Sequence, residues 1–486
     1  MTAPRLSTRG LRSLRPTGEV RLPVSPGRPR RGIVHLGIGA FHRAHQATFT
    51  EDAMEATGDE SWGICGITQR SRSVVEQLVP QDCLYGVLER DDDDLRLRII
   101  GAVREVVFAG DDPWGVADLI ADGDITVATL TVTEKGYRRT AGGRLDLTDP
   151  GVRADLAGSP PTTAVGQLVR GLQLRAQRDH AGITVLSCDN LPANGAVLAQ
   201  LVDDFCAALA GSEGDVLRAW IATNARFPSS MVDRIVPATS PGDTDDARRL
   251  TGLLDAGLVV AEPYRQWVIE DAFAGARPAW EGAGALLVDD VEPYEAAKLR
   301  LLNATHSLLA YAGALAGHAT IADAVHDRAL AAASEHYMAD DATPTLRMPA
   351  GFDAEQYRAS VLRRFANSAL RHTTTQVAMD GSQKLPVRLL GVVRDRLAQG
   401  AEPTWAAFAV AAWMLYVARS RTDPRGYPLQ DPIAGRLRET ASGPVSGLAR
   451  RMLGLTEIFG PELAGSDAFA DLLDERVHQL DHDNPP

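Results

Sequence analysis

The segment that most constrains the fold is residues 32–39, GIVHLGIG, followed by the helical pattern of residues 40–56. The apolar run predicts a short buried strand, and its two glycines predict a tight turn into a helix. Gly37 would permit the turn, Gly39 would let the backbone approach a pyrophosphate, and the helix N-terminus would supply N–H donors. His42 stands where a third glycine is usual. The stretch favours the start of a dinucleotide-binding domain, although a plain strand-to-helix turn has the same pattern.

Short apolar runs and helical patterns alternate after this start. The predicted strands are Trp62–Ile67, Leu95–Ile100, Ile125–Val132 and Ile183–Cys188, and Thr163–Arg178 is a predicted amphipathic helix. Strands that alternate with helices are typical of an α/β domain with a parallel sheet. Residues 227–237 break the pattern and are expected to be irregular.

Polar clusters follow two of the predicted strands. TEKGY at residues 133–137 follows one of them, and Asp189 and Asn190 follow another. Ligands of open α/β sheets bind at the carboxyl ends of the strands, so both clusters are candidate ligand contacts. Asn190 taken alone is equally compatible with a simple turn, which asparagine favours.

The end of the second predicted strand bears on the choice of cofactor. NAD enzymes often place Asp or Glu there to hold the ribose hydroxyls. Here residues 68–72 read TQRSR, with no acid. Arg70 and Arg72 would suit a 2′-phosphate, but solvated arginines at a helix start have the same pattern. NAD and NADP are therefore both compatible with the sequence.

The second half of the chain opens with a helix that is predicted to begin near Tyr294 and to run without Gly or Pro until Gly313. At roughly 100° per residue, its polar side chains fall within an arc of about 140°. These side chains are Glu295, Lys298, Asn303 and His306. Leu301 and Leu308 point elsewhere and are expected to pack. A carboxylate, an amine, an amide and an imidazole on one face suit a reaction cleft, but an ordinary polar face shows the same spacing.

Domain boundaries follow from these patterns. Beyond residue 288 nearly all segments have helical periodicity, as in Thr404–Ser420. We therefore predict a loose N-terminal arm at residues 1–31, a Rossmann-type α/β domain at 32–288 and a mostly α-helical domain at 289–486. The arm is rich in arginine but lacks the apolar core of a secretory signal, which leaves an organelle transit peptide as the alternative.

Composition excludes several classes of function. The 486 residues carry a formal net charge of −13, which argues against a nucleic-acid surface. No apolar run approaches the roughly 20 residues of a membrane span. The cysteines are Cys65, Cys83, Cys188 and Cys206, and they lack the spacing of a metal site. Scattered cysteines in a chain of this size suggest reduced thiols and a cytoplasmic protein.

An ordered set of motifs resembles the polyol-specific long-chain dehydrogenases, the family of mannitol 2-dehydrogenase, fructuronate reductase (D-mannonate oxidoreductase) and arabinitol dehydrogenase. The motifs are GIGAFHRAH, TVTEKGY, SCDN, FPSSMVDRI, QWVIED, the helix of residues 294–306 and DGSQK, in this order from Gly37 to Lys384. The resemblance implies a Rossmann-type domain, a mostly helical domain, an active site between them and no catalytic metal.

The same resemblance assigns catalytic roles. It implies that Lys298 is the general acid/base, that Asn190 and Asn303 hydrogen-bond the reacting oxygen, that His306 orients the substrate and that Glu295 relays a proton. A free lysine, with a pKa of about 10.4, is a poor base near pH 7. Burial beside a positively charged nicotinamide would lower its pKa toward a useful range.

The resemblance also implies binding residues. The cofactor contacts are Gly37, Gly39, Phe41, Arg70, Thr133 and Lys135, for NAD with NADP possible. The substrate contacts are Asp233, Arg265, Arg371, His372 and Lys384. Arginine forks suit carboxylates, so Arg265 and Arg371 favour the reduction of D-fructuronate to D-mannonate. The expected partner is a small polyol or keto-uronate, without nucleic acid or membrane, and the expected state is a monomer or small homo-oligomer.

Three other interpretations compete with this one. Oxidation of D-mannitol to D-fructose is the alternative reaction, with Arg265 in a structural role. Tyr294 and Lys298 also match the Tyr/Lys pair of short-chain dehydrogenases, but this chain is about twice as long and has Leu36 where that family has Thr. A cofactor-binding regulatory protein is the non-enzymatic alternative. The intact set of Lys298, Asn190, Asn303 and His306 argues against it.

Overall fold

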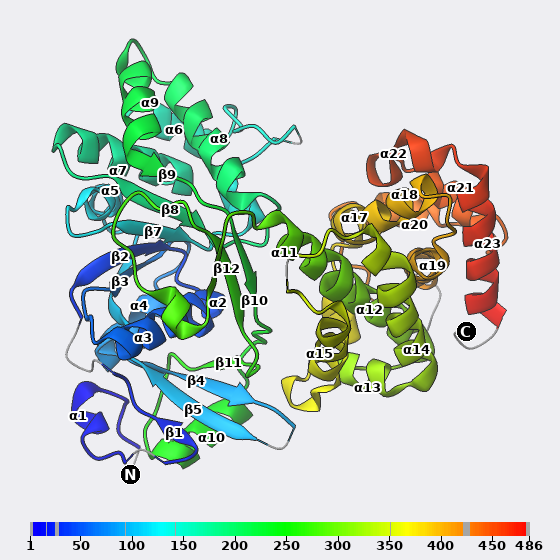
Figure 1. The fold of residues 1–486 in the computed structure, drawn as a ribbon, viewed down its shortest axis with the longest axis horizontal. Helices are drawn as coiled ribbons and strands as arrows, with labels where there is room; N and C mark the ends of the chain where they lie inside the picture. The colour runs from blue at the N-terminus through cyan, green and yellow to red at the C-terminus, as the bar shows by residue number, and fades with distance from the viewer. Residues whose placement is uncertain are drawn as a thin grey trace. The chain divides into compact units, whose positions relative to one another are not determined.

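The computed structural model describes residues 3–15, 17–24, 29–92, 94–140, 142–349, 351–420 and 428–482. The chain forms two compact units, Met1–Glu292 and Pro293–Pro486. The first is a Rossmann-type α/β unit and the second is mostly helical (Figure 1). The fold class predicted from the sequence is confirmed. The units divide after Glu292, a few residues beyond the predicted residue 288.

A six-stranded parallel sheet forms the centre of the first unit. Its strands, in spatial order, are β6 (Val103–Phe108), β3 (Gly63–Thr68), β2 (Arg31–Leu36), β7 (Val127–Leu130), β8 (Ile183–Ser187) and β9 (Ala225–Arg226). Every neighbouring pair is parallel. Along the chain this is the order 3-2-1-4-5-6 of a dinucleotide-binding sheet, whose ligand lies where the order reverses. The reversal occurs between β2 and β7.

Each face of this sheet has its own apolar core, because successive strand residues point to opposite faces. In β8, Val185 packs against the helices α5 (Pro113–Ala121), α7 (Ala164–Gln177) and α8 (Asn194–Ala207). The next residue, Leu186, packs on the other face with Phe49 of α3 (Gln46–Thr57). The sheet is thus covered on both sides, which fixes the edge at which a ligand has access.

Two smaller sheets complete the first unit. One has the order β1 (Val20–Arg21), β5 (Leu95–Ile100), β4 (Tyr85–Arg90) and β11 (Val259–Ala261); the other has β10 (Ser230–Asp233), β12 (Gln266–Glu270) and β13 (Leu286–Val288). The predicted strand at residues 95–100 therefore exists as β5, but it belongs to one of the smaller sheets. The third strand of the main sheet along the chain is β6, which was not predicted and lies at the sheet's edge. Residues 227–237 were expected to be irregular, yet they contain β10. This strand forms because β12 offers it an antiparallel partner, with Asp233 opposite Gln266.

The N-terminal segment is packed rather than loose. Its described residues form α1 (Thr8–Leu11) and β1, and β1 pairs in parallel with β5. Leu6 and Leu11 are buried against Leu84 and Leu253. The prediction of a loose arm overlooked these leucines, which are spaced among the arginines and supply the apolar contacts.

The helix predicted at residues 40–56 is two helices, α2 (Ala40–Ala44) and α3. The break lies at His45, whose φ and ψ are −118° and −82°. Its Nε2 is 2.8 Å from the carbonyl oxygen of Gln266 in β12. The break thus coincides with a long-range hydrogen bond and not with a helix-breaking residue. The sequence pattern did not reveal this distant partner.

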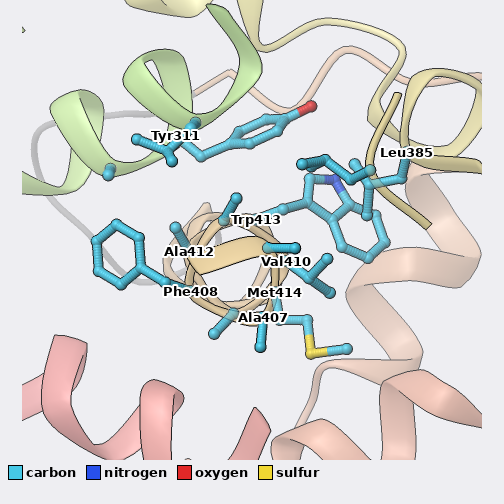
Figure 2. Close-up of a cluster of buried hydrophobic side chains, with 14 of the residues drawn as sticks. Tyr311, Leu385, Ala407, Phe408, Val410, Ala412, Trp413 and Met414 are labelled. Carbon is cyan, nitrogen blue, oxygen red and sulfur yellow. The ribbon is translucent and has the colours of Figure 1, made fainter. Parts of the chain in front are cut away.

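The second unit is organised around one buried helix, α19 (Thr404–Arg419), which packs against α12 (Ala304–Ala316) and α23 (Asp467–His482). Figure 2 shows α19 end-on with apolar side chains on all sides, including Phe408 and Trp413. A helix that is apolar all round belongs in a core. None of the helices in the described part of the chain has the length and apolar character needed to cross a membrane.

Candidate active site

A pocket of about 500 Å³ opens in the first unit at the carboxyl ends of β2, β3 and β7. Its wall includes Gly37, Gly39, Arg70, Thr133 and Lys135, which are five of the six predicted cofactor contacts. Arg138 adds a third basic side chain, and no lining residue is acidic. A cationic pocket at the switch point of a parallel sheet suits a phosphate-bearing ligand.

Gly37 meets the steric requirement that the sequence suggested. Its φ is 98°, and a Cβ there would lie 2.2 Å from the carbonyl oxygen of Thr131. The Thr131 hydroxyl donates to the Gly37 carbonyl at 2.8 Å, which joins the turn after β2 to the end of β7. A Cβ at Gly39 would have only the Gly37 carbonyl within 4 Å, at 3.8 Å. Gly39 therefore leaves an open surface for a ligand.

The end of β3 places Gln69 and Arg70 in the pocket wall. Gln69 donates to the side chain of Gln167 at 2.7 Å. Arg70 is exposed and has no hydrogen bond or ion pair with a described residue. Arg72 instead pairs with Asp111. Arg70 is thus the arginine of this segment that is available to a ligand in the pocket.

Phe41 is the predicted cofactor residue that does not line this pocket. Its ring stacks on His45, with centroids 5.1 Å apart and an interplanar angle of 14°. At the end of β8, Asn190 is exposed, and the neighbouring Asp189 is buried.

The helix that carries the predicted catalytic residues is not a continuous α-helix. Residues Lys298–Asn303 form a π-helical segment between α11 (Glu292–Ala297) and α12. In an α-helix, two residues five apart point about 140° away from each other. A π turn closes between residues five apart, so Lys298 and Asn303 lie one turn apart on the same side. Both are buried.

Three polar atoms of this helix and of the residues packed against it are buried without a hydrogen-bond partner among the described residues. They are Asn303 Nδ2, His306 Nε2 and His372 Nδ1. The His306 ring stacks on Phe365 at 4.7 Å and meets the His372 ring edge-on at 5.0 Å. Because buried polar groups are nearly always paired, these atoms indicate a place for a polar ligand.

Cationic side chains act on the pKa of His306. Burial holds this pKa well below its usual range, and the neighbouring imidazole of His372 and the positive charges of Arg388, Lys384 and Arg364 act in the same direction. Burial and the charge of Lys384 likewise lower the pKa of His372. Both imidazoles are therefore neutral near pH 7, so each has one nitrogen that donates and one that accepts.

Arg388 is a residue of this region that sequence reasoning missed. Its Nη1 donates to the Asn303 carbonyl and to the Ser307 hydroxyl, both at 3.1 Å. It therefore ties the π segment to a second π segment, Pro386–Leu390. Its position four residues after Lys384 was the available signal, since such pairs share a helix face.

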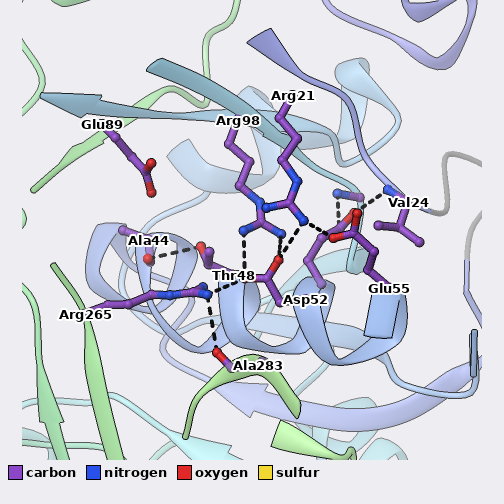
Figure 3. A network of polar contacts seen from close by, with 12 residues as sticks. Arg21, Val24, Ala44, Thr48, Asp52, Glu55, Glu89, Arg98, Arg265 and Ala283 are labelled. Atoms are coloured by element: carbon purple, nitrogen blue, oxygen red, sulfur yellow. Dashed lines mark hydrogen bonds and ion pairs between the residues drawn. The ribbon is translucent and has the colours of Figure 1, made fainter. Parts of the chain in front are cut away.

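The predicted substrate residues have different surroundings. Arg265 belongs to a network on α3: it pairs with Asp52, which also accepts from Arg98 Nη1 at 2.8 Å (Figure 3). Its guanidinium lies 4.4 Å from the centroid of the Phe49 ring. These contacts place Arg265 in a structural network, while its Nη1 is buried without a hydrogen-bond partner among the described residues, and the predicted substrate contact stays a prediction.

The remaining substrate candidates are Asp233, Arg371, His372 and Lys384. Asp233 is buried at the end of β10. Lys384 donates to the Val377 carbonyl at 3.2 Å. Arg371 is exposed, with a φ of 48°, and directly follows the 3-10 turn Ser368–Leu370. The Arg371 side chain makes no hydrogen bond or ion pair with any described residue.

Within the described part of the chain, no group of three or more His, Cys, Asp or Glu residues is placed to hold a metal ion.

Residues 31–282 match the mannitol dehydrogenase Rossmann domain, and residues 290–481 match the mannitol dehydrogenase C-terminal domain. The chain belongs to the mannitol dehydrogenase family. The predicted resemblance is confirmed, and the protein is an oxidoreductase of the class that acts on CH–OH groups, with a Rossmann domain for an NAD-type cofactor.

Members of the mannitol dehydrogenase family match over nearly the whole chain. D-mannonate oxidoreductase of Escherichia coli K12 is 40% identical over 455 residues, which are 92% of this chain and 93% of that protein. The structure of Pseudomonas fluorescens mannitol 2-dehydrogenase with NAD and D-mannitol has a TM-score of 0.86 and 35% identity, covering 98% of this chain and 97% of that one. A D-sorbitol dehydrogenase structure has a TM-score of 0.87 and 31% identity, covering 98% of each chain.

Proposed function

We propose that the protein reduces D-fructuronate to D-mannonate with NAD(H), and that Lys298 is the general acid/base. The observation that carries the proposal is that the donor Asn303 Nδ2 and the ring atom His306 Nε2 are buried without a partner among the described residues, on the same helix as the buried Lys298. A ketone oxygen that becomes an alkoxide needs such donors. It also needs a proton, which a lysine ammonium supplies.

Lysine is rare in this chain, and its distribution supports the assignment. The sequence has lysine only at positions 135, 298 and 384, although lysine and arginine together number 50. Arginine cannot act as a proton donor and acceptor near neutral pH, whereas a buried lysine amine can. All three lysines belong to the predicted cofactor, catalytic or substrate residues.

The roles of the other residues follow from their chemistry. The bound nicotinamide would carry the hydride. Asn303 and Asn190 are proposed to donate to the reacting oxygen, and Glu295 to exchange the proton with solvent. His306, neutral near pH 7 and held between Phe365 and His372, is proposed to orient the substrate. Gly37, Gly39, Lys135 and Arg138 would hold the cofactor phosphates.

The substrate follows from charge. The basic groups near His306, namely Arg364, Lys384 and Arg388, would attract an anionic sugar, and the similarity to a D-mannonate oxidoreductase supports a sugar acid. Oxidation of D-mannitol to D-fructose is the second candidate, favoured by the similarity to the mannitol 2-dehydrogenase complex. The polar atoms Asn303 Nδ2 and His306 Nε2, which are buried without a partner in the described part of the chain, argue against a purely regulatory role.

Rates of NADH oxidation with D-fructuronate and with D-fructose test the substrate. We expect Arg371→Ala to lower kcat/KM for D-fructuronate at least tenfold, because a hydrogen bond to a charged group contributes about 1.5–3 kcal/mol. D-Fructose, which has no carboxylate, should lose less than threefold. Arg371→Lys is the matched control: it keeps the charge without the fork and should fall between. Equal losses on both sugars would exclude the carboxylate contact, and a wild type that prefers D-fructose would support the mannitol reaction.

Cofactor choice is a separate prediction. The similarity to a mannitol 2-dehydrogenase solved with NAD favours NAD(H). Because β3 ends without an acid and Arg70 in the pocket wall has no hydrogen bond or ion pair with a described residue, we expect NAD(H) to be preferred and NADP(H) to be measurably used. Arg70→Ala should lower kcat/KM for NADPH at least tenfold and change that for NADH less than threefold, since only NADPH has a 2′-phosphate. Arg72→Ala is the control, because its guanidinium is paired with Asp111. A uniform loss for both cofactors would show that Arg70 does not read the 2′-phosphate.

A further inference from the structure

The carboxylate of Asp189 binds the backbone of two residues in the wall of the cofactor pocket. Asp189 is buried and is not among the residues that line the pocket. Its Oδ2 accepts from the backbone N–H of Val132 at 3.0 Å, and its Oδ1 accepts from that of Thr133 at 2.9 Å. The hydroxyl of Tyr137 donates to Oδ2 at 2.8 Å. Both Val132 and Thr133 line the pocket.

Thr133 has a backbone conformation that threonine rarely adopts. Its φ and ψ are 67° and 161°. This region is essentially reserved for glycine, and other residues persist there only where the surrounding structure enforces it. A β-branched residue at positive φ is a particular outlier. The hydrogen bond from Thr133 N–H to Asp189 fixes the peptide plane before Thr133, and the Thr133 carbonyl accepts from Gly136 N–H at 2.9 Å, which fixes the plane after it. The two bonds together can enforce this conformation.

Two consecutive N–H groups bound by one carboxylate determine the orientation of two peptide planes, those on either side of Val132. This segment begins directly after Thr131, whose carbonyl faces Gly37. The position of the pocket wall relative to the glycine turn is therefore set by Asp189.

The main chain of Asp189 is anchored independently of its carboxylate. Its carbonyl accepts from Leu191 N–H at 2.8 Å and from Asn194 Nδ2 at 3.0 Å. Asn194 in turn accepts from Ser230 N–H at 2.9 Å. Removal of the carboxylate charge should leave this anchor, and with it the backbone that carries Asn190, in place.

We propose that Asp189 is a positioning residue for the cofactor, whose carboxylate keeps Thr133 in its strained conformation and so shapes the pocket for binding. The inference rests on the proposed function in one respect, namely that this pocket holds the cofactor.

Asp189→Asn tests the proposal with little change of shape. The amide has one acceptor oxygen, so one of the two N–H groups would face an NH₂ group instead. We expect the Kd of NADH, measured by fluorescence titration, and the KM for the cofactor to rise at least tenfold. With saturating cofactor, kcat should stay within threefold. Tyr137→Phe is the matched control, because it removes a neighbouring bond to the same carboxylate and leaves both bonds to the pocket wall. Its Kd should stay within threefold of the wild type.

A glycine at position 133 separates positioning from a general structural effect. Glycine adopts φ and ψ of this kind without enforcement. In a Thr133→Gly background, Asp189→Asn should therefore raise the Kd no more than threefold. An equal loss of affinity in both backgrounds would overturn the proposal. If Asp189→Asn alone does not fold, the Kd of Thr133→Gly can still be compared with the Kd of the double variant Thr133→Gly, Asp189→Asn. A tenfold difference between these two Kd values would also overturn the proposal.

The failure of the inference is distinguishable from the failure of the proposed function. A wild-type protein that binds neither NADH nor NADPH would overturn both. A wild type that binds NADH, with an Asp189→Asn variant of unchanged affinity, would overturn the positioning role and leave the proposed reaction intact.

Discussion

Lys298→Ala should lower kcat by about 10²–10⁴-fold, the range expected for loss of a general acid/base. The physical reason is that the alkoxide formed by hydride transfer would lack a proton donor. Lys298 is 8% exposed, which limits replacement by solvent. The measurements are kcat with saturating D-fructuronate and NADH, together with the Kd of NADH. The Kd should stay within threefold, because the cofactor pocket belongs to the first unit.

Lys298→Arg is the matched control for charge. It keeps a cation at the same position but replaces the amine with a group that stays protonated, so it should be nearly as slow as the alanine variant. Full activity of the arginine variant would indicate that position 298 supplies only charge. An alanine variant within threefold of the wild-type kcat would exclude the acid/base role.

Asn303→Ala should lower kcat by about 10²–10³-fold, as expected for removal of one preorganised donor to a developing oxyanion. Asn303 is 7% exposed, and its Nδ2 has no partner among the described residues. Its amide N–H groups therefore stabilise no contact of the free protein that the structure describes. We expect the thermal midpoint to change little while turnover falls, and parallel measurements of kcat and Tm would show this.

Two variants on the same helix sharpen the test. Asn303→Asp keeps the shape but places a negative charge beside the oxygen, so it should be at least as slow as alanine. Ser307→Ala removes a hydroxyl that bonds Arg388 one turn further on, and its kcat should stay within threefold. A loss of Tm in Asn303→Ala that accounts for the whole loss of activity would assign Asn303 a structural role.

Local patterns in the sequence were sufficient for several features of the site. Gly37 was recognisable from the glycine turn after the first predicted strand, and the structure gives the steric reason, since the close approach of Thr131 leaves no space for a side chain. Leu301 and Leu308 were correctly predicted to pack, and both are fully buried. The α/β character of the first unit and the helical character of the second were also predictable, since a period of about 2 or 3.6 depends only on which face is buried. The order of motifs from Gly37 to Lys384 identified the family.

Other features depend on partners far away in the chain. Strand β6 lies beside β3 in the main sheet, whereas β5 pairs with β4, and no local pattern distinguishes these partners. Arg265 looked like a carboxylate ligand, but the fold brings Asp52 and Phe49 to it. An isolated arginine in a sequence cannot reveal which anion it will meet.

The sequence by itself therefore determined the fold class, the family and the chemical types available to the site, because these follow from periodicity, glycine sterics and side-chain chemistry. The tertiary structure decided how they are presented. The π turn places Lys298 and Asn303 on one side of the helix, whereas regular α-helical spacing would separate them by about 140°. Asp189 meets Val132 and Thr133 only when β7 and β8 pair. Both arrangements depend on packing and hydrogen bonds between segments distant in the chain, which a one-dimensional pattern does not encode.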